Sequence, residues 1–280
     1  MKTLSNKLVA ITGAASGMGR SLAVECARRG SDVALVDVDE AGLAETVARA
    51  RAARPGARVE AERLDVSDRA GIYAWAERVR ESLGGADVLV NNAGVSLSAS
   101  VERMTDEDFE WLFGINFWGV VNGCRAFLPQ LRARPESHIV NLSSVFGMIG
   151  VPTQSAYCAA KFAVRGFTET LRQELADTPV RVSCVHPGGI KTDIARRGRH
   201  YEDAHGGPAD PDRVAADFER AARTTADEAA QVILRGVLAD EPRILIGADA
   251  RVIDVLARVA PRRYDAVVRR VARMSSKRSR

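Results

Sequence analysis

An α/β fold with one doubly wound parallel sheet, covered by helices on both faces, is predicted by three features of the 280-residue sequence. Short apolar runs alternate with helical stretches of about 12–16 residues, which is typical of βαβ units. Turns rich in glycine or asparagine follow several of these runs, where parallel strands would end. Hydrophobic residues make up 46% of the chain and charged residues 27%, as in ordinary globular domains. A chain of this length can bury the core of one large domain.

Seven segments are expected to form the strands, among them short apolar runs with the length of a buried parallel strand. They span residues 8–12, 32–36, 58–64, 87–90, 138–143, 180–185 and 243–246. Helices are expected over residues 20–29, 40–54, 68–83, 105–129, 154–176 and 225–238. Pro55-Gly56 and Gly84-Gly85 end two of these helices, while Thr105 and Thr225 begin two others with the pattern of a capping box.

The first predicted strand leads into a glycine-rich loop that favours dinucleotide binding. The loop reads Gly13-Ala14-Ala15-Ser16-Gly17-Met18-Gly19 and opens a helix. Glycines let the backbone approach a pyrophosphate, and the start of the helix offers amide donors. The spacing differs from the general Gly-x-Gly-x-x-Gly fingerprint. Taken alone, the loop would also fit an ordinary tight turn.

Asp37, at the end of the second predicted strand, indicates which dinucleotide is bound. A carboxylate at this distance from the first glycine accepts hydrogen bonds from the ribose hydroxyls and repels a 2′-phosphate. Val38 and Asp39 follow it, and Ser16 rather than a base precedes Gly17. We therefore expect NAD as the cofactor and regard NADP as disfavoured.

Tyr157 and Lys161 stand four residues apart on a predicted helix, so both side chains lie on one face, one turn apart. A free phenol has a pKa near ~10. A neighbouring ammonium is expected to lower that pKa, towards the range in which general acid–base catalysis works. Ser144 follows the fifth predicted strand and can face Tyr157 to hold a substrate oxygen. Without the rest of the chain, the Tyr–Lys pair would be interpreted as a surface pair.

A turn over residues 187–192 follows the sixth predicted strand, at the edge of the sheet where open α/β folds bind ligands. His186, just before it, is expected to be structural because Pro187 fixes the local backbone. The segment from about 190 to 225 is expected to be a mobile lid over the substrate. Its arginines, Arg196, Arg197 and Arg199, would meet either an anionic group or water.

The basic character of the chain is concentrated in its C-terminal tail. The net charge is +4, and residues 251–280 hold ten Lys or Arg and two Asp. Helical periodicity appears on both sides of Pro261. A solvated or oligomer-packing helix is the favoured interpretation, and an amphipathic helix on an anionic membrane surface is the alternative.

Cysteine usage and the absence of long apolar runs predict a cytoplasmic protein. No run approaches the roughly 18–20 residues of a membrane span, and the N-terminus reaches the glycine loop too soon for a signal peptide. No metal site and no nucleic-acid partner are expected. The cysteines lack metal-ligand spacing and are expected to be reduced and buried: Cys26, Cys124, Cys158 and Cys184.

Together these motifs resemble the short-chain dehydrogenase/reductase family over roughly residues 6–247. Thr12–Gly19 match its cofactor loop, and Asp37 matches its NAD-selecting acid. Further matches are Asp65 and Val66 to its adenine contact, Asn91-Asn92-Ala93-Gly94 to the segment that steadies the sheet, Pro187, Gly188, Ile190 and Thr192 to the nicotinamide loop, and Asn116, Ser144, Tyr157 and Lys161 to its catalytic tetrad. The resemblance implies one Rossmann-type domain of about seven strands over residues 1–248, followed by a helical extension at 249–280.

The resemblance also implies a mechanism. Tyr157 exchanges a proton with the substrate oxygen while hydride moves between substrate and nicotinamide, and Lys161 lowers the Tyr157 pKa and binds the nicotinamide ribose. Ser144 orients the oxygen, and Asn116 holds a water that links Lys161 to solvent. The implied cofactor-binding residues are Gly13, Ser16, Gly17, Met18, Gly19, Asp37, Asp65, Val66, Asn92, Ala93, Gly94, Tyr157, Lys161, Pro187, Gly188, Ile190 and Thr192.

The predicted function is interconversion of a secondary alcohol and a ketone, in a homo-oligomer of two or four subunits as the family implies. Apolar residues near Ser144 favour a lipophilic substrate of steroid, retinoid or fatty type: Val145, Phe146, Met148, Ile149 and Val151. A dehydrogenase of small diols or acetoin-like compounds stays open as an alternative. Asp37 opposes an NADPH-dependent 3-oxoacyl reductase, and the complete tetrad opposes a dinucleotide sensor without catalysis.

Overall fold

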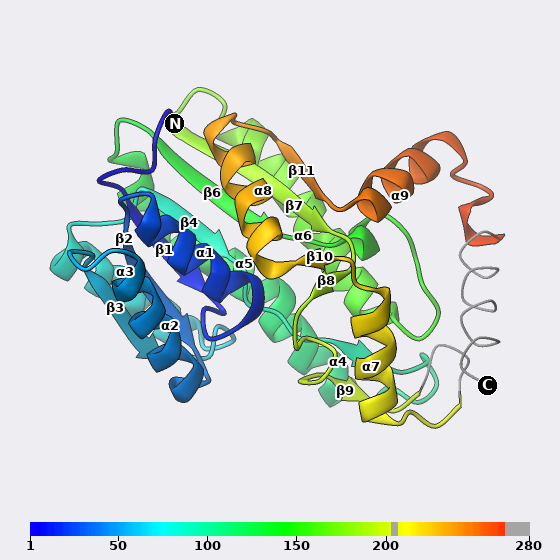
Figure 1. Ribbon diagram of the computed structural model, residues 1–280. Coiled ribbons are helices and arrows are strands. Elements are labelled where there is room, and N and C mark those ends of the chain that lie inside the picture. The colour runs from blue at the N-terminus through cyan, green and yellow to red at the C-terminus, as the bar shows by residue number, and fades with distance from the viewer. Residues whose placement is uncertain (203–206, 267–280) are drawn as a thin grey trace.

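A seven-stranded parallel sheet lies at the centre of the computed structural model, which describes residues 1–202 and 207–266 (Figure 1). The strand order is β11-β7-β6-β4-β1-β2-β3, and every neighbouring pair is parallel. The strands are β1 (Leu8–Thr12), β2 (Asp32–Asp37), β3 (Val59–Arg63), β4 (Val88–Asn91), β6 (Ser137–Leu142), β7 (Val180–Pro187) and β11 (Arg243–Ile246). The predicted α/β fold is therefore confirmed.

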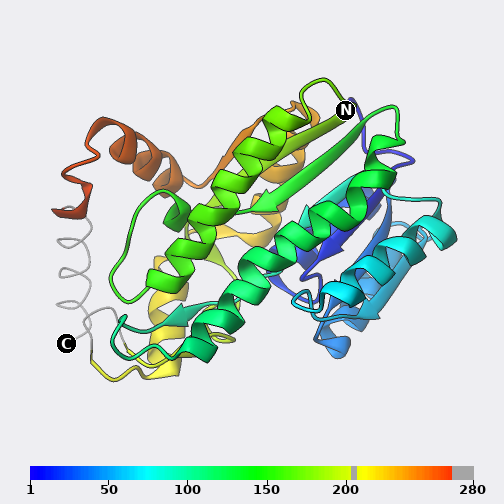
Figure 2. The same cartoon turned by 180° about the vertical axis from the view of Figure 1, so that it is seen from behind.

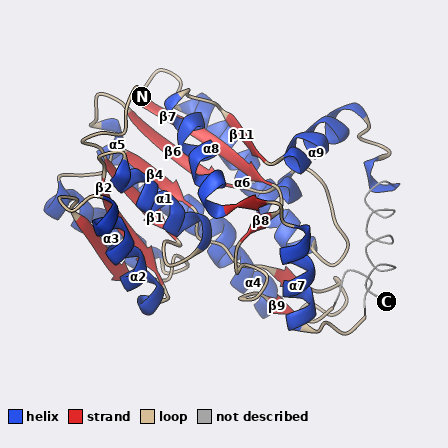
Figure 3. Ribbon diagram, in the orientation of Figure 1, coloured by secondary structure: helices blue, strands red, loops and turns tan. Residues whose placement is uncertain are grey.

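Helices cover both faces of the sheet, as Figure 3 shows. One face carries α1 (Gly17–Arg28), α2 (Glu40–Ala53) and α8 (Ala226–Leu238), and the other carries α3 (Arg69–Leu83), α5 (Gly119–Arg132) and α6 (Ser155–Glu174). The inner strands are apolar because their side chains point alternately to two faces that are both covered by helices. The edge strand β3 is instead partly exposed and carries Glu60 and Glu62. In β1, Val9 and Ile11 enter the core on the α1 side, whereas Leu8 and Ala10 enter the core on the α3 side.

The order of the strands reverses between β1 and β4. β1 pairs with β2 on one side and with β4 on the other. Crossover connections therefore leave this point in opposite directions, which opens a crevice at the carboxyl ends of the two strands. The turns that follow β1 and β4 are those rich in glycine and asparagine.

The helix predicted from residue 105 to 129 is instead three consecutive pieces. α4 (Asp106–Phe113) is followed by the π-helix η1 (Gly114–Trp118), and α5 then continues past Pro129 to Arg132. The expected stop at Pro129 is thus wrong. A proline inside a helix costs about 3 kcal/mol, but Phe127 and Leu131 are fully buried beside it. Burying two such side chains offsets a cost of that size.

The segment expected to be a loop, from about 190 to 225, contains regular structure. Its short strands β8 (Ile190–Lys191) and β10 (Thr224–Thr225) pair with each other, and β9 (Arg199–His200) pairs with β5 (Leu97–Ser98). Between them lies α7 (Pro211–Ala221). Its start follows the usual rules, because Asp210 caps it and Pro211 takes the first helical position. We keep the name lid for residues 190–225.

The helix α9 (Ala248–Val259) lies in the segment predicted to be the C-terminal extension, residues 249–280. The rest of the predicted tail, from residue 267 on, lies outside the described residues. In the part of the chain that is described, no helix is both long and apolar enough to cross a membrane. All four cysteines are unpaired and buried, as expected.

Candidate functional site

A cleft of about 350 Å³ opens at the carboxyl ends of β1 and β4. It unites segments that are far apart in the sequence. Its lining consists of Gly13, Ser16, Gly17, Met18, Asp37, Val38, Leu64, Asp65, Val66, Asn92, Ala93, Gly94, Val95, Trp111, Ile115, Thr192, Asp193, Ile194 and Arg197. Most of the residues predicted to bind the cofactor are therefore brought together. Of the others, Gly19 lies in the first turn of α1, and Tyr157 and Lys161 belong to α6. Pro187 ends β7, Gly188 follows it, and Ile190 begins β8, two residues before Thr192.

Close backbone packing forms the floor of this cleft. A Cβ atom at Gly13 would lie 2.7 Å from the Cα of Ala93, and one at Gly19 would lie 2.1 Å from the carbonyl oxygen of Gly13. Both positions therefore exclude any side chain. The hydroxyl oxygen of Thr12 joins the two turns, because it accepts hydrogen bonds from the backbone N–H groups of Asn92 and Ala93, each at 3.0 Å. A cradle of this kind suits a dinucleotide, whose phosphates approach bare backbone.

Asp37 lies at the edge of the cleft and is fixed by the glycine loop. Its Oδ2 accepts a hydrogen bond from the backbone N–H of Ala15 at 2.9 Å. The cap of α2 is Asp39, which accepts a bond from the N–H of Gly42 at 3.0 Å. Asp37 is therefore not needed as a helix cap. The residues next to Asp37 in the sequence supply no cation, but a cation from the lid lies near this end of the cleft. Nη2 of Arg197 is 3.1 Å from Oδ2 of Asp39.

Ser144 and Tyr157 face each other across the connection between β6 and α6. Ser144 precedes the short 3₁₀-helix η2 (Val145–Gly147), and its Oγ accepts a hydrogen bond from the N–H of Phe146 at 3.1 Å. Burial raises the pKa of Tyr157 to about 12, while a side-chain hydrogen bond with Ser144 acts in the lowering direction. The net direction is opposite to the one predicted from Lys161 alone. In this structure the phenol is protonated at neutral pH.

Lys161 is buried beside the ring of Tyr157. Its Nζ lies 5.7 Å from the centre of that ring and donates a hydrogen bond to the carbonyl oxygen of Leu142 at 2.9 Å. Burial lowers the pKa of Lys161 to about 8, because desolvation disfavours the ammonium. The backbone around it is fixed as well, since the hydroxyl of Ser143 donates to the carbonyl oxygen of Lys161 at 2.8 Å.

Asn116 lies in the π-helix and is fully buried. Its side-chain amide pairs with the backbone of Val95: Oδ1 accepts from the N–H at 2.8 Å and Nδ2 donates to the carbonyl at 2.9 Å. A Cβ atom at Gly94 would lie 3.2 Å from Oδ1 of Asn116 and 3.6 Å from Nζ of Lys161. The two predicted residues therefore border the same space. Single π-turns of this kind are frequent at functional sites.

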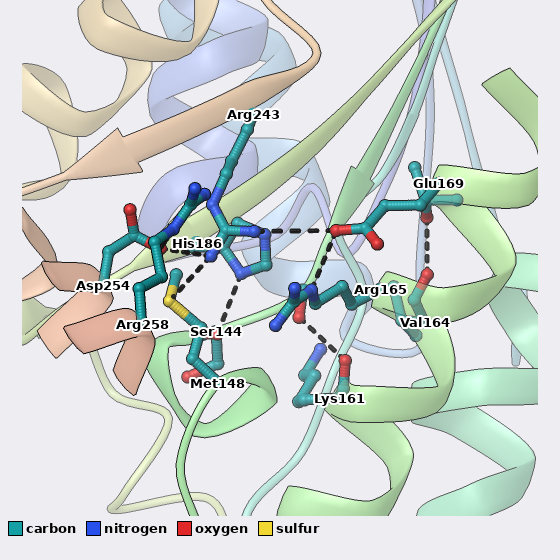
Figure 4. A network of polar contacts seen from close by, with 12 residues as sticks. Ser144, Met148, Lys161, Val164, Arg165, Glu169, His186, Arg243, Asp254 and Arg258 are labelled. Carbon is teal, nitrogen blue, oxygen red and sulfur yellow. Dashed lines mark hydrogen bonds and ion pairs between the residues drawn. The ribbon is translucent and has the colours of Figure 1, made fainter. Parts of the chain in front are cut away.

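His186 supports the site from behind, where Figure 4 shows it between Ser144 and Arg243. Its Nδ1 donates a hydrogen bond to the backbone oxygen of Ser144 at 3.1 Å. Burial lowers the pKa of His186 to about 4, so the ring is neutral at physiological pH. This arrangement agrees with the structural role predicted for His186.

The arginines of the lid pair with acids of the same chain. Arg199 lies 2.7 Å from Asp108 in α4 and 3.9 Å from the centre of the Trp111 ring. Arg196 lies 3.8 Å from Asp212. The pairs of Arg199 with Asp108 and of Arg197 with Asp39 fasten the lid to the domain, whereas the pair of Arg196 with Asp212 lies within the lid. Sequence reasoning missed Trp111, Ile115 and Arg197 as lining residues, because helical periodicity assigns the first two to an apolar face and gives the third no partner.

The comparisons with known proteins agree with this geometry. The sequence pattern described as short chain dehydrogenase matches residues 7–203. The chain is 44% identical over 272 residues to the "Putative oxidoreductase SadH" of Mycobacterium tuberculosis, with 96% of each chain covered. It is 31% identical over 272 residues to estradiol 17-beta-dehydrogenase 11 of Homo sapiens, covering 96% of this chain and 84% of that protein.

A solved structure is similar over nearly the whole chain. It is a short chain dehydrogenase/reductase from Burkholderia phymatum in complex with NAD, with a TM-score of 0.84 and 32% sequence identity. The similarity covers 95% of this chain and 96% of that one. The chain thus belongs to the short chain dehydrogenase family, whose members are oxidoreductases that bind a nicotinamide dinucleotide.

Proposed function

We propose that this protein is an NAD-dependent dehydrogenase that interconverts a secondary alcohol and a ketone, with Tyr157 as the general acid and base. The observation that carries the proposal is the position of three side chains next to the dinucleotide cleft. Ser144 and Tyr157 face each other, and the buried Lys161 lies beside the phenol ring. Asn116 reaches the same space from the π-helix.

Bound NAD supplies the acceptor or donor of the hydride. The glycine loop, Asp37, the Asn92–Gly94 turn and Thr192 would hold it in the cleft. Ser144 donates a hydrogen bond to the substrate oxygen and polarises it. Tyr157, protonated at neutral pH, gives its proton to that oxygen during ketone reduction and takes it back during alcohol oxidation. The Lys161 ammonium stabilises the phenolate formed when Tyr157 gives up its proton.

The preference for NAD over NADP rests on Asp37. Its carboxylate is fixed by Ala15 at the edge of the cleft, where a ribose 2′-phosphate would meet negative charge. The charge of Arg197, which could favour such a phosphate, is matched by Asp39. The NAD complex of the Burkholderia phymatum relative also supports this preference.

A lipophilic substrate is proposed from the residues around Ser144. Val145, Met148 and Ile149 are all buried in the loop that leads from Ser144 to Tyr157. The name of the human relative, which refers to estradiol, supports a substrate of this class. We further propose that the protein is a cytoplasmic homo-oligomer.

The proposal is tested by mixing the protein with NAD and a panel of secondary alcohols, from steroids and long-chain alcohols to small diols. Formation of reduced nicotinamide is recorded for the wild type and for Tyr157→Phe, and NAD and NADP binding are measured by calorimetry. We expect turnover on lipophilic members of the panel and a loss of at least about 10²-fold in Tyr157→Phe. We also expect unchanged NAD binding in the variant and weaker NADP binding in both proteins.

Retained turnover in Tyr157→Phe would show that another group transfers the proton. Turnover only on small diols would contradict the proposed lipophilic substrate and favour the alternative, a dehydrogenase of small diols. NAD binding by the wild type without turnover on any alcohol of the panel would favour a dinucleotide sensor.

A further inference from the structure

The first turn of α9 reaches the loop that follows β7. Oδ2 of Asp249 accepts a hydrogen bond from the backbone N–H of Gly189 at 2.7 Å. A Cβ atom at Gly188 would lie 2.2 Å from Oδ1 of the same carboxylate. Asp249 therefore occupies the space that a side chain at position 188 would need. This contact joins the C-terminal extension to residues 187–192.

That loop needs an external support. Gly188 and Gly189 are adjacent, and glycine has more backbone freedom to lose than any other residue. The N–H of Gly188 donates to the carbonyl oxygen of Ile246 at 2.9 Å, so β11 fixes the loop on one side. Asp249 fixes the next residue through its side chain. On the lid side, the N–H of Thr224 in β10 donates to the carbonyl oxygen of Gly189 at 3.4 Å. The path of the two glycines is therefore set by β11, by β10 and by the side chain of Asp249 at the start of α9.

The position of the loop matters for the cleft, because Thr192 lines it. A Cβ atom at Gly17 would lie 3.0 Å from Cγ2 of Thr192, so the loop closes against the glycine loop across the cleft. Only two residues separate Gly189 from Thr192. A displacement of Gly189 would therefore move one wall of the cleft.

α9 is itself held in place by a second carboxylate. Asp254 accepts hydrogen bonds from Nη2 of Arg243 and, at 3.2 Å, from Nε of Arg258. The same Arg243 lies 3.2 Å from Sδ of Met148 and 3.5 Å from Glu169 of α6 (Figure 4). The helix is therefore anchored to the loop after Ser144 and to the helix that carries Tyr157. Asp249 therefore lies on a helix, α9, whose position is fixed by these contacts.

We infer that Asp249 is a positioning residue for the cofactor, which holds residues 187–192 in their binding conformation before the dinucleotide arrives. A loop that is already ordered loses less conformational freedom on binding, so affinity rises without a new contact to the ligand. The inference rests on the proposed function, because it assigns this loop to the nicotinamide half of NAD.

The test compares Asp249→Ala and Asp249→Asn with a matched control, Asp227→Ala. Asp227 holds the same second position in α8 as Asp249 does in α9, so both alanine variants remove a carboxylate from a helix start. The carboxylate of Asp227 accepts a hydrogen bond from the hydroxyl of Ser21 in α1 at 2.6 Å, on the exposed surface. The readouts are the Kd of NAD by calorimetry, KM and kcat, and Tm.

We expect Asp249→Ala to raise the Kd of NAD by about tenfold, as for loss of one hydrogen bond to a charged group. The KM for NAD should rise in parallel while kcat changes less than about threefold. Asp249→Asn should restore most of the affinity, because its amide oxygen can accept the same bond. Asp227→Ala should bind NAD like the wild type.

An unchanged Kd in Asp249→Ala would overturn the inference, and so would equal losses in Asp249→Asn and Asp249→Ala. If Asp227→Ala raises the Kd of NAD as much as Asp249→Ala does, and both variants lower Tm, the role of Asp249 is only structural. This result would also overturn the inference. These outcomes all presuppose a wild type that binds NAD. Failure of the wild type to bind NAD would instead contradict the proposed function.

Discussion

Burial decides the protonation of the two central side chains of the site. The Tyr157 pKa is raised to about 12 and the Lys161 pKa is lowered to about 8, in both cases chiefly because desolvation disfavours the charged form. Each residue therefore favours its neutral form more than it would in water. The buried ammonium of Lys161 lowers the free energy of unfolding, as groups kept for function commonly do.

Lys161→Met is expected to stabilise the fold at pH 7 by about 1–3 kcal/mol while turnover is lost. The folded-state pKa of Lys161, about 8, lies below the ordinary value of 10.5. Between these pH values the unfolded chain binds more protons, so the contribution of Lys161 to stability rises with pH. The advantage of the variant should therefore shrink as pH rises from 8 towards 10.5.

Urea denaturation at pH 7 and pH 10 measures this difference. Lys191→Met is the matched control, because the Lys191 side chain is exposed and its removal relieves no burial. An advantage of Lys161→Met that grows with pH, or none at pH 7, would contradict the account.

Sequence reasoning selected Ser144, Tyr157 and Lys161 because they belong to one local strand–loop–helix segment. It assigned no role to Asp249, whose partner Gly189 lies 60 residues away. The direction of the Tyr157 pKa shift was also wrong. Spacing along a helix reveals a neighbouring charge, but the extent of desolvation depends on elements that pack around the residue only after folding.

At the scale of elements, a buried acid of the domain helps to hold the lid. Asp108 in α4 accepts hydrogen bonds from Arg199 at 2.7 Å and from the hydroxyl of Tyr201 at 3.2 Å. Burial alone would raise the pKa of Asp108, but these bonds outweigh it and hold the pKa below the usual range. The carboxylate is therefore charged and fastens β9 next to β5.

Asp108→Ala is expected to loosen the lid, because Arg199 and Tyr201 lose their shared partner. Trypsin should then cleave after the lid arginines several times faster than in the wild type, and the KM for the alcohol should rise. Asp212→Ala is the control: its ion pair with Arg196 is solvent-exposed, with 93% of the Asp212 side chain accessible, and such pairs contribute little. Equal cleavage rates in the wild type and Asp108→Ala would show that β9 holds the lid without Asp108.

The elements themselves were predicted to within a few residues wherever apolar periodicity was strong. The exceptions have local physical causes. The π-helix at Gly114–Trp118 shifts the hydrogen-bond pattern by one residue, which a 3.6-residue period does not register. Pro129 stays inside α5 because packing outweighs helix propensity. In the lid, α7 has few buried residues and so gives a weak signal.

At the scale of the whole molecule, two aromatic side chains are exposed on the surface formed by η1, α5 and α6, beside α3. Trp118 is 52% exposed and Phe162 is 42% exposed. Figure 2 shows α5 and α6 side by side on this face. Exposed aromatic residues are enriched at interfaces between proteins, so we expect this face to form the contact in the proposed homo-oligomer.

The double variant Trp118→Glu/Phe162→Glu is expected to be a monomer, since an isologous contact would bring the new charges of two subunits together. Light scattering after size-exclusion chromatography gives the mass of each protein. Tyr73→Glu is the control, because Tyr73 is an aromatic residue of α3 that is 37% exposed. A monomeric wild type, or an oligomer that survives the double change, would exclude this face.

The strand order also has a consequence for synthesis of the chain. During synthesis β1 is followed closely by its neighbour β2, and the two can pair early. Its other neighbour, β4, is made much later, because Val9 of β1 pairs with Val88 of β4. Until β4 leaves the ribosome, the backbone groups along one edge of β1 are unpaired. The strand also carries apolar side chains on both of its faces. Such an edge is a template for wrong pairing, and contacts between distant residues form slowly. This protein therefore depends most on protection from aggregation during the period when β1 has been synthesised and β4 has not.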